Sequence, residues 1–524
     1  MRRGRYWMVL VAVGVVGTVG CSSFSPGESE TVAPTPDASS EQQPPLPTDA
    51  PPPVVSPPGD DELTESYGVF VAPSGTADGD GSRARPLGSI AAAIEKAKPQ
   101  AKRVYVCTGI YKEALVLANA VTLIGGLECG ATWKLTSTGR SQIEAPTSPA
   151  LRANDITNDT SFMGFTVTAP NGTQANPSSF GLIAHDAKHL RIVSSTIRAG
   201  NGLAGVAGTG GAGLAEGATA NGGSGTSSID PYPASRLDGI KGYPSCAGGA
   251  GGVSTCGGGT GGRGGSGGVF HCVLDPGSTT ARSWAVQQHR AGLKTYTLDP
   301  TAPQVPTNAG SNGGDGANGT TGSEMGALTE DGYTTSDGTK GGDGGPGGGG
   351  AGGLQVAAPT GVCSDDTISK PGCGPGGGAG GCGALAGLAG TGGGASVGAS
   401  LFDSDGLVFD AVELYGGTGG NGGMGSFGTL PTLGGAPGST VTGSGVGGQG
   451  GRGGLAGWSG GGGGGPSLGL AHVGGAPSLV NGASAKAGKG GIGAPPLQTS
   501  IVGQIQSLPG APDGKTADVF PWTR

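Results

Sequence analysis

The sequence is poor in charge, and no basic segment stands out along it. Only 13% of the 524 residues are charged, and the formal net charge is −8. Proteins that bind nucleic acid carry clustered lysine and arginine, which form a positive patch. The composition therefore excludes nucleic acid as an expected partner, and the mild acidity needs no explanation beyond ordinary solubility.

Cysteine spacing typical of zinc sites is also missing. No Cys-x-x-Cys pair occurs among the nine cysteines, and His271 beside Cys272 stands alone. The sequence therefore predicts no metal site built from cysteine and histidine. The apolar run from Tyr6 to about Val19 is too short to cross a bilayer, for which about 20 residues are needed. It follows several arginines and fits the hydrophobic region of a secretory signal.

The end of this run, Thr18–Cys21, resembles the lipobox of bacterial lipoproteins, with threonine in place of the usual leucine. The resemblance implies that Cys21 is acylated and becomes the mature N-terminus, which anchors the protein to a membrane. An ordinary cleaved signal is the alternative. With Ser22 after the cysteine, we expect a bacterial cell-envelope protein, an outer-membrane lipoprotein that faces the periplasm or the cell surface.

Eight cysteines remain once Cys21 is set aside, an even number in an oxidising compartment. Four disulfides are therefore possible. The spacing suggests Cys107 with Cys129 and Cys246 with Cys256. Three pairings stay open for the last four cysteines, which are Cys272, Cys363, Cys373 and Cys382.

Short β-rich segments follow one another between 104 and 193 with no helices between them. Parallel strands need long crossovers unless the chain coils, so that each strand stacks on its counterpart one turn later. A recurring phrase supports such a coil: it appears at Ala150–Asp155, at Gly181–Asp186 and at Gly398–Asp403, with a weaker copy from Gly469. When equivalent residues of successive turns stack on one another, each buried apolar column continues from one turn to the next. The pattern predicts an all-β parallel β-helix.

A short helix is predicted before these strands. Ser89 is its N-cap, Ile90, Ile94 and Ala97 form its apolar face, and Pro99 ends it. Because its single apolar face needs a surface to cover, we expect it to cap the N-terminal end of the coil.

The segment from Val69 to Trp133 resembles the opening of pectin-lyase-like right-handed parallel β-helix proteins, and is closest to the bacterial surface lipoproteins of that class. The matching motifs are Val69–Gly75, Arg85–Ile90, Val104–Tyr111 and Leu123–Gly126. The resemblance implies a right-handed parallel β-helix and says little about chemistry.

Three glycine-rich excursions interrupt the repeats, at Gly200 to about Ala395, at Gly416 to Pro466 and at Gly482 to about Gly493. The first two follow the same phrase, so we expect both to leave from the same corner of the coil. Gly-Gly-x recurs inside them, and a period of three matches polyproline II geometry. Packed polyglycine II helices are one interpretation and flexible glycine linkers the other. The composition resembles the repeat regions of mycobacterial PE-PGRS proteins.

Asp155, Asp186 and Asp403 end the recurring phrase and are predicted to stack as a column of carboxylates. In β-helix lyases such a column can bind Ca²⁺ while an arginine or lysine abstracts a proton from a polysaccharide. Arg152, Lys188 and Arg191 are nearby in sequence. The competing interpretation, which we favour, is that an aspartate at a repeated turn bonds its own backbone. Gly-Gly-Asp-Gly at 313–316 and 341–344 likewise lacks the tandem repeats of calcium-binding nonapeptides.

The expected function is a structural or interaction role without catalysis, through contact with a cell-surface polysaccharide or protein. The alternative is a polysaccharide lyase or hydrolase on the same scaffold. We call one turn of the predicted β-helix a rung. The expected organisation begins with a signal peptide and lipobox at 1–21 and a disordered tether rich in Pro, Ser and Thr at 22–66. The N-terminal rungs follow at 67–199, a glycine-rich excursion at 200–396, a rung at 397–415, a second excursion at 416–466, and the last rung and tail at 467–524.

Overall fold

The computed structural model describes residues 59, 62–130, 132–211, 249–256, 259–261, 269–274, 282–290, 293–297, 309–353, 368–369, 375–439, 446–501 and 504–523. The predicted signal peptide, the acylation site Cys21, nearly all of the tether and Cys246 lie outside these residues.

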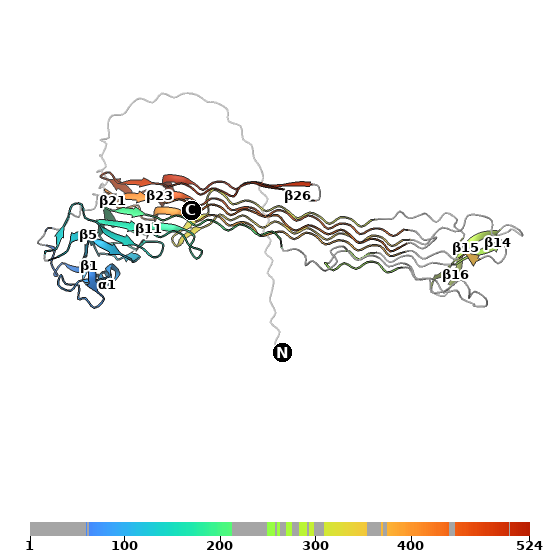
Figure 1. The fold of residues 1–524 in the computed structure, drawn as a ribbon, viewed down its shortest axis with the longest axis horizontal. Helices are drawn as coiled ribbons and strands as arrows, with labels where there is room; N and C mark the ends of the chain where they lie inside the picture. The colour runs from blue at the N-terminus through green and yellow to red at the C-terminus, as the bar shows by residue number, and fades with distance from the viewer. Residues whose placement is uncertain are drawn as a thin grey trace, which may run out of the picture. The chain divides into compact units, whose positions relative to one another are not determined.

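The described chain is mostly β-structure with few helices, and its large sheets are parallel (Figure 1). We name the three large sheets A, B and C. Sheet A contains β1 (Gly68–Thr76), β2 (Arg103–Cys107), β5 (Leu123–Glu128), β9 (Thr160–Met163), β12 (Leu190–Val193), β21 (Val408–Asp410) and β24 (Ser478–Val480), with β6 (Lys134–Leu135) antiparallel to β5. Sheet B contains β3 (Gly109–Tyr111), β7 (Ser141–Glu144), β10 (Phe165–Thr168), β13 (Thr196–Arg198), β22 (Glu413–Tyr415) and β25 (Ser484–Lys486). Sheet C contains β4 (Leu115–Leu117), β8 (Leu151–Asn154), β11 (Ser179–His185), β20 (Ser396–Phe402), β23 (Ser467–Val473) and β28 (Thr516–Pro521).

The chain visits the three sheets in rotation. From β7 onward it passes from sheet B to C to A and back to B, and each passage adds one parallel strand to each sheet. We call one such passage a coil. This topology needs no crossover helices, because the partner of each strand is its counterpart in the next coil.

The pairing register agrees with the repeat offsets in the sequence. Leu182 pairs with Leu151 on one side and with Ala399 on the other, and Val167 pairs with Ile197. Ala399 in turn pairs with Leu470, so the weak fourth copy of the phrase is a true counterpart. The recurring phrase therefore marks structurally equivalent positions, even across 217 residues of sequence.

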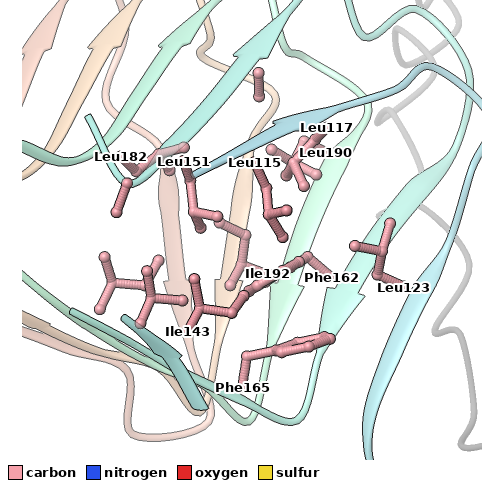
Figure 2. Close-up of a cluster of buried hydrophobic side chains, with 14 of the residues drawn as sticks. Leu115, Leu117, Leu123, Ile143, Leu151, Phe162, Phe165, Leu182, Leu190 and Ile192 are labelled. Carbon is pink, nitrogen blue, oxygen red and sulfur yellow. The ribbon is translucent and has the colours of Figure 1, made fainter. Parts of the chain in front are cut away.

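The core lies between the three sheets. Alternate strand residues point inward and stack in columns, as Figure 2 shows for the cluster that includes Leu151, Leu182, Phe162 and Ile192. The rings of Phe162 and Phe165 stack with centroids 4.3 Å apart. Burial of these columns is the main source of stability in this part of the chain.

The predicted capping helix is present as α1 (Ile90–Ala97), followed by a 3₁₀ turn, η2 (Lys98–Gln100). The Ala92 N–H donates to Ser89 Oγ, and the N–H groups of Ile90 and Ala91 donate to the Glu113 carboxylate. This helix end therefore has its free amides satisfied by side chains. Its buried residues are Ile90, Ala93, Ile94 and Ala97.

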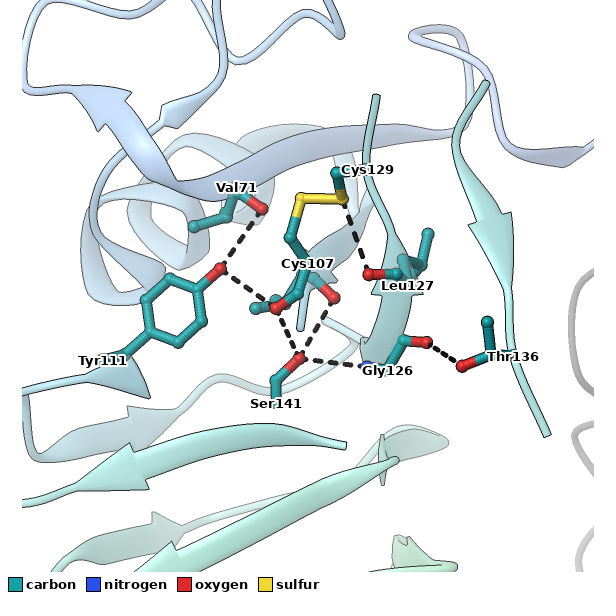
Figure 3. Close-up of a disulfide and its surroundings, with 9 residues drawn as sticks. Val71, Cys107, Tyr111, Gly126, Leu127, Cys129, Thr136 and Ser141 are labelled. Carbon is teal, nitrogen blue, oxygen red and sulfur yellow. Dashed lines mark hydrogen bonds between the residues drawn. A yellow bond between two sulfur atoms is a disulfide. The ribbon is translucent and has the colours of Figure 1, made fainter. Parts of the chain in front are cut away.

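The structure joins Cys107 to Cys129 by a disulfide, the pair that the spacing suggests (Figure 3). Beside it, Ser141 Oγ donates to the carbonyl groups of Cys107 and Val106 and accepts the Gly126 N–H. The Tyr111 hydroxyl lies 3.1 Å from the Cys107 carbonyl oxygen, and burial raises the pKa of Tyr111 above its usual value. The disulfide thus joins the buried Cys107 to the exposed Cys129, beside a hydrogen-bonded corner between sheets A and B.

The second predicted pair is wrong. Cys256 is bonded to Cys382, 126 residues away in sequence, so it does not pair with Cys246. Short separation favours a local pair only if the intervening loop folds back on itself. Here glycine-rich segments that are distant in sequence run side by side and bring Cys382 to Cys256.

The glycine-rich segments leave the coils between a sheet B strand and the following sheet C strand. They follow β13, β22 and β25, and the chain returns at β20, β23 and β28. The third segment therefore begins after Lys486, later than the predicted Gly482, because β25 occupies 484–486. At the shared exit, the Ala199 N–H donates to the Tyr415 carbonyl and the Gly416 N–H to the Lys486 carbonyl. As predicted, the segments leave from one corner, one above another.

The glycine-rich segments run side by side (Figure 1). Their backbones are hydrogen-bonded to one another with a period of three residues. In one parallel run, a glycine N–H donates to a carbonyl oxygen of the neighbouring segment at every third residue: Gly202 to Thr418, Gly205 to Asn421, Gly208 to Met424 and Gly211 to Phe427. A second parallel run has the same period: Gly310 to Gln449, Gly313 to Arg452, Gly316 to Leu455, Gly319 to Trp458 and Gly322 to Gly461. Antiparallel neighbours add further bonds, for example from Gly394 to Leu203 and from Thr391 to Val206. We call these bonded segments the glycine layers.

Smaller antiparallel sheets occur within the excursions. They are formed by β14 (Val269–Leu274), β15 (Arg282–Arg290), β16 (Leu293–Thr297) and β19 (Ile368–Ser369), by β17 (Ala327–Thr329) and β18 (Gly332–Thr334), and by β26 (Leu497–Ile501) and β27 (Gln504–Leu508). Leu328 of the β17–β18 hairpin packs on the outer face of sheet C with Phe180, Ile183 and Phe402.

Candidate functional site

The three predicted aspartates do stack. Asp155, Asp186 and Asp403 each follow a sheet C strand, and the register aligns them across neighbouring coils. The N–H groups of these three aspartates donate to the carbonyls of His185, Phe402 and Val473, respectively. The carboxylates therefore lie at equivalent corners between sheets C and A, as the repeat predicts.

Backbone conformation explains why aspartate recurs there. The φ angles are 54° at Asp155, 47° at Asp186 and 48° at Asp403, all in the left-handed region. Aspartate tolerates this region better than most residues because its short side chain bonds nearby backbone. The equivalent position in the next coil is Gly474, with φ of 91°. Since glycine can replace aspartate here, the corner requires the conformation and does not require a carboxylate.

Of the three basic residues near these carboxylates in sequence, one contacts a carboxylate of the column and two have other partners. Lys188 Nζ lies 3.4 Å from Asp186 Oδ1, in an exposed ion pair. Arg152 Nη1 donates to the Glu330 carbonyl oxygen. Arg191 lies on β12 of sheet A and pairs with Asp410. The expected set of carboxylates and base is thus divided between separate contacts.

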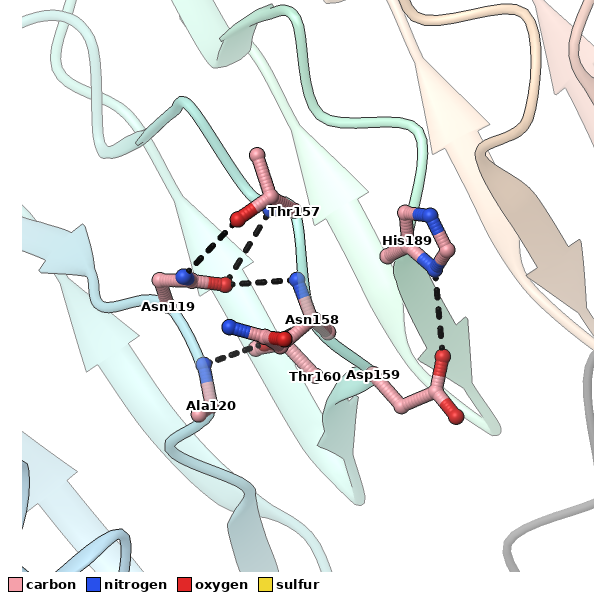
Figure 4. A network of polar contacts seen from close by, with 7 residues as sticks. All are labelled: Asn119, Ala120, Thr157, Asn158, Asp159, Thr160 and His189. Atoms are coloured by element: carbon pink, nitrogen blue, oxygen red, sulfur yellow. Dashed lines mark hydrogen bonds and ion pairs between the residues drawn. The ribbon is translucent and has the colours of Figure 1, made fainter.

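The following residues of the same corner bond backbone groups (Figure 4). Asn119 Oδ1 accepts the N–H groups of Thr157 and Asn158, and Thr160 Oγ1 accepts the Ala120 N–H. His189 Nδ1 lies 3.2 Å from Asp159 Oδ1 at the surface. These polar groups stabilise the bend between two coils.

Two further histidines, His185 and His472, also have separate contacts. His185 Nε2 lies 3.4 Å from Glu330 Oε1, and His472 Nδ1 lies 3.1 Å from the Gly474 carbonyl oxygen. Within the described ranges, no group of three or more His, Cys, Asp or Glu side chains could hold a metal ion.

A buried ion pair that the sequence did not predict links three coils of sheet A. Arg191 Nη2 donates to Asp410 Oδ2 at 2.6 Å, and Asn481 Nδ2 donates to Asp410 Oδ1 at 2.6 Å. Burial alone would raise the pKa of Asp410, but the bonds from Asn481 and Arg191 outweigh it and lower the pKa. Arg191 and Asp410 lie more than 200 residues apart, so only the 217-residue offset could have brought them together. Asn481 also has a left-handed φ, 52°, which suits its corner position.

The Gly-Gly-Asp-Gly motifs have a structural role in the glycine layers. Asp315 Oδ1 accepts the Leu455 N–H, and Asp343 Oδ1 accepts the Ala386 N–H. Asn312 and Asn318, three residues on either side of Asp315, accept the N–H groups of Arg452 and Trp458. The side chain at the third position of the repeat thus accepts hydrogen bonds from backbone amides that do not take part in the glycine-to-carbonyl bonds. This satisfies the backbone polar groups inside the glycine layers.

A column of serines holds the exits of the glycine segments. Ser179, Ser396 and Ser467 are in register at the starts of their sheet C strands, and all three are fully buried. Ser396 Oγ donates to the Gly200 carbonyl and accepts the Gly417 N–H. Ser467 Oγ likewise donates to the Gly417 carbonyl and accepts the Gly488 N–H. Ser179 Oγ donates to the Pro170 carbonyl and accepts the Gly200 N–H. We call these residues the serine ladder. Serines are too frequent in this sequence for the ladder to have been found without the register.

Sheet B presents a different surface, because its outer face is mostly polar, with Ile110 of β3 as an exposed apolar exception. Sheets A and C carry buried apolar clusters on their outer faces, which include Phe70 and Trp133 on sheet A and Phe180 and Phe402 on sheet C. On sheet B, the outward residues Gln142, Glu144, Thr168, Arg198, Glu413 and Lys486 are exposed. Arg198 and Tyr415 are cross-strand partners, and the guanidinium carbon lies 3.9 Å from the ring centroid. This face is the candidate interaction site.

The chain matches no family model, no curated protein and no solved structure. In the part of the chain that the structure describes, no helix is both long and apolar enough to cross a membrane. The proposed function therefore rests on the geometry of the described residues alone.

Proposed function

We propose that the three sheets form a right-handed parallel β-helix and that the glycine layers are packed polyglycine II helices. The rotation among sheets A, B and C supports the first part. The hydrogen bonds at every third glycine support the second, because polyproline II geometry has three residues per turn and no internal hydrogen bonds. On this proposal the layers are ordered through backbone groups bonded between segments.

We further propose that the protein is a lipid-anchored structural and adhesive component of the bacterial cell envelope, without catalysis. The observation that carries the adhesive role is the largely polar outer face of sheet B, with the Arg198 guanidinium over the Tyr415 ring. An arginine held over an aromatic ring loses little further side-chain entropy on binding, and its N–H groups match carboxylate and hydroxyl oxygens. The contact proposed is with an acidic cell-surface polysaccharide.

Binding to a panel of acidic and neutral polysaccharides tests the adhesive role. We expect the full-length chain to cosediment with an acidic polymer, and Arg198→Ala to weaken this several-fold. Arg85→Ala is the matched control, since Arg85 is exposed and pairs with Asp78 and Asp80 outside sheet B. Equal binding by both variants would remove sheet B as the contact surface.

The same incubations distinguish adhesion from cleavage. We expect no unsaturated uronate ends to form in the presence of Ca²⁺. Formation of such ends, abolished by Asp186→Ala, would instead establish the lyase alternative.

The anchor has its own test. We expect palmitate to label the wild-type chain in bacteria and to be absent from Cys21→Ala. An unlabelled wild type would contradict the lipoprotein assignment and leave the sheet B proposal intact.

A further inference from the structure

The two ends of the coil stack differ. At the first end, α1 covers the interior with Ile90, Ala93, Ile94 and Ala97 (Figure 1). At the other end, β24, β25 and β28 are each the last strand of their sheet. Among the strands that the structure describes, none pairs with the free edges of these three.

The apolar columns of the core also reach the surface at this second end. The sheet A column runs through Phe162, Ile192 and Phe409, all fully buried, to Leu479, which is 38% exposed. The sheet C column runs through Ala399 and Leu470 to Val519, which is 42% exposed.

An end of this kind invites pairing. Free strand edges present unpaired N–H and C=O groups, and repeat stacks need a polar terminal unit to stay soluble. Here three free edges surround an exposed apolar interior. We call β24, β25 and β28 together with Leu479 and Val519 the open end.

We propose that a second copy of this chain covers the open end, so that two molecules meet tail to tail about a two-fold axis. Such an axis reverses the direction in which the chain circulates, so facing edges meet antiparallel, a favourable pairing for β-strands. A head-to-tail arrangement is excluded by α1 at the other end. Two-fold contacts of this type close into dimers and do not continue as fibres.

Charge supports a particular axis. If the axis passes through sheet A, β24 pairs with the β24 of the second copy, and β25 faces its β28. Lys486 on β25 and Asp518 on β28 are both exposed, and Asp518 Oδ1 also accepts the Ala487 N–H of its own copy, so on this axis opposite charges of the two copies face each other. Opposite charges on facing strands favour pairing, and Leu479 lies beside its own counterpart near the axis.

Sedimentation velocity of the full-length chain in mild detergent, over a range of concentrations, tests the proposal. We expect a dimer, and we expect Leu479→Lys combined with Val519→Lys to raise the dimer dissociation constant at least 100-fold. Val116→Lys is the matched control, because Val116 is 61% exposed on β4, far from the open end along the stack. This variant should remain a dimer.

A milder variant keeps the test decisive if the double substitution disturbs folding. Leu479→Cys should form a disulfide between two copies under oxidising conditions, whereas Val116→Cys should not. A wild type that stays monomeric, a dimer that survives the double substitution with its fold intact, open-ended oligomers, or equal crosslinking at Val116→Cys would each overturn the proposal.

Discussion

The coil stack and the glycine layers solve the same problem with opposite means. In the coils, large side chains such as Phe162 and Phe409 fill the interior, and every strand pairs with its counterpart. In the layers, the absence of side chains lets backbones touch, and hydrogen bonds take the place of an apolar core. Stability in the coils therefore depends on buried side-chain volume. In the glycine layers it depends on the absence of side chains.

Removal of core volume from the coils should have the largest effect. Phe162→Ala leaves a cavity beside Phe165 and should lower the free energy of unfolding by about 3–5 kcal/mol. Chemical denaturation followed by circular dichroism measures this. Val116→Ala, at a side chain that is 61% exposed, should change stability by less than about 0.5 kcal/mol. Equal losses at the two positions would mean that the columns do not hold the coils together.

Loss of the buried ion pair should come next. Arg191→Met leaves the Asp410 carboxylate buried with only Asn481, which should cost about 3 kcal/mol at neutral pH. The folded-state pKa of Asp410 is lowered, so its contribution is complete above the unfolded pKa of about 4 and is lost as pH falls through the folded value. Denaturation between neutral and acid pH should therefore show a smaller acid destabilisation in Arg191→Met. Identical pH profiles would argue against the pair.

A single methyl group in a glycine layer should have a local effect. A Cβ on Gly457 would lie 1.9 Å from the Ala317 carbonyl oxygen, so Gly457→Ala must separate two segments at a cost of at least about 1–3 kcal/mol. Gly314→Ala is the control, since nothing lies within 4 Å of its Cβ position. Hydrogen exchange should accelerate between 310 and 322 in the first variant only, with the coils protected as before. Fast exchange there in the wild type would instead favour flexible glycine linkers.

The junction of the two regions should respond more weakly. Ser396→Ala removes one donor and one acceptor from the serine ladder and should cost about 1–2 kcal/mol, because the Gly417 amide is left unpaired. Hydrogen exchange should show faster opening of the second excursion from its root. Ser426→Ala, which breaks a bond inside the layers, is the comparison. An unchanged root in Ser396→Ala would show that backbone bonds alone fix the exits.

Sequence periodicity predicted the coils better than the contacts between them. The 31- and 217-residue offsets locate equivalent strands because buried columns require like residues at like positions. The serine ladder, the Arg191–Asp410 pair and the Cys256–Cys382 disulfide depend on which distant segments lie side by side. Local spacing contains no such information, so the predicted Cys246–Cys256 pair failed. The glycine repeat predicted a period of three but not the role of its third residue, which caps a neighbour's amide.

The aspartate column should be the least sensitive feature. Asp186→Gly keeps the left-handed corner that Gly474 already shows to be compatible with the fold, and it loses only an exposed ion pair with Lys188. Its cost should stay within about 1 kcal/mol. Asp186→Val places a β-branched side chain at φ of 47° and should cost about 1–2 kcal/mol. Thermal denaturation of the two variants separates conformation from charge. If glycine is as damaging as valine, the carboxylate itself is what the corner needs, and the column regains its interest as a binding site.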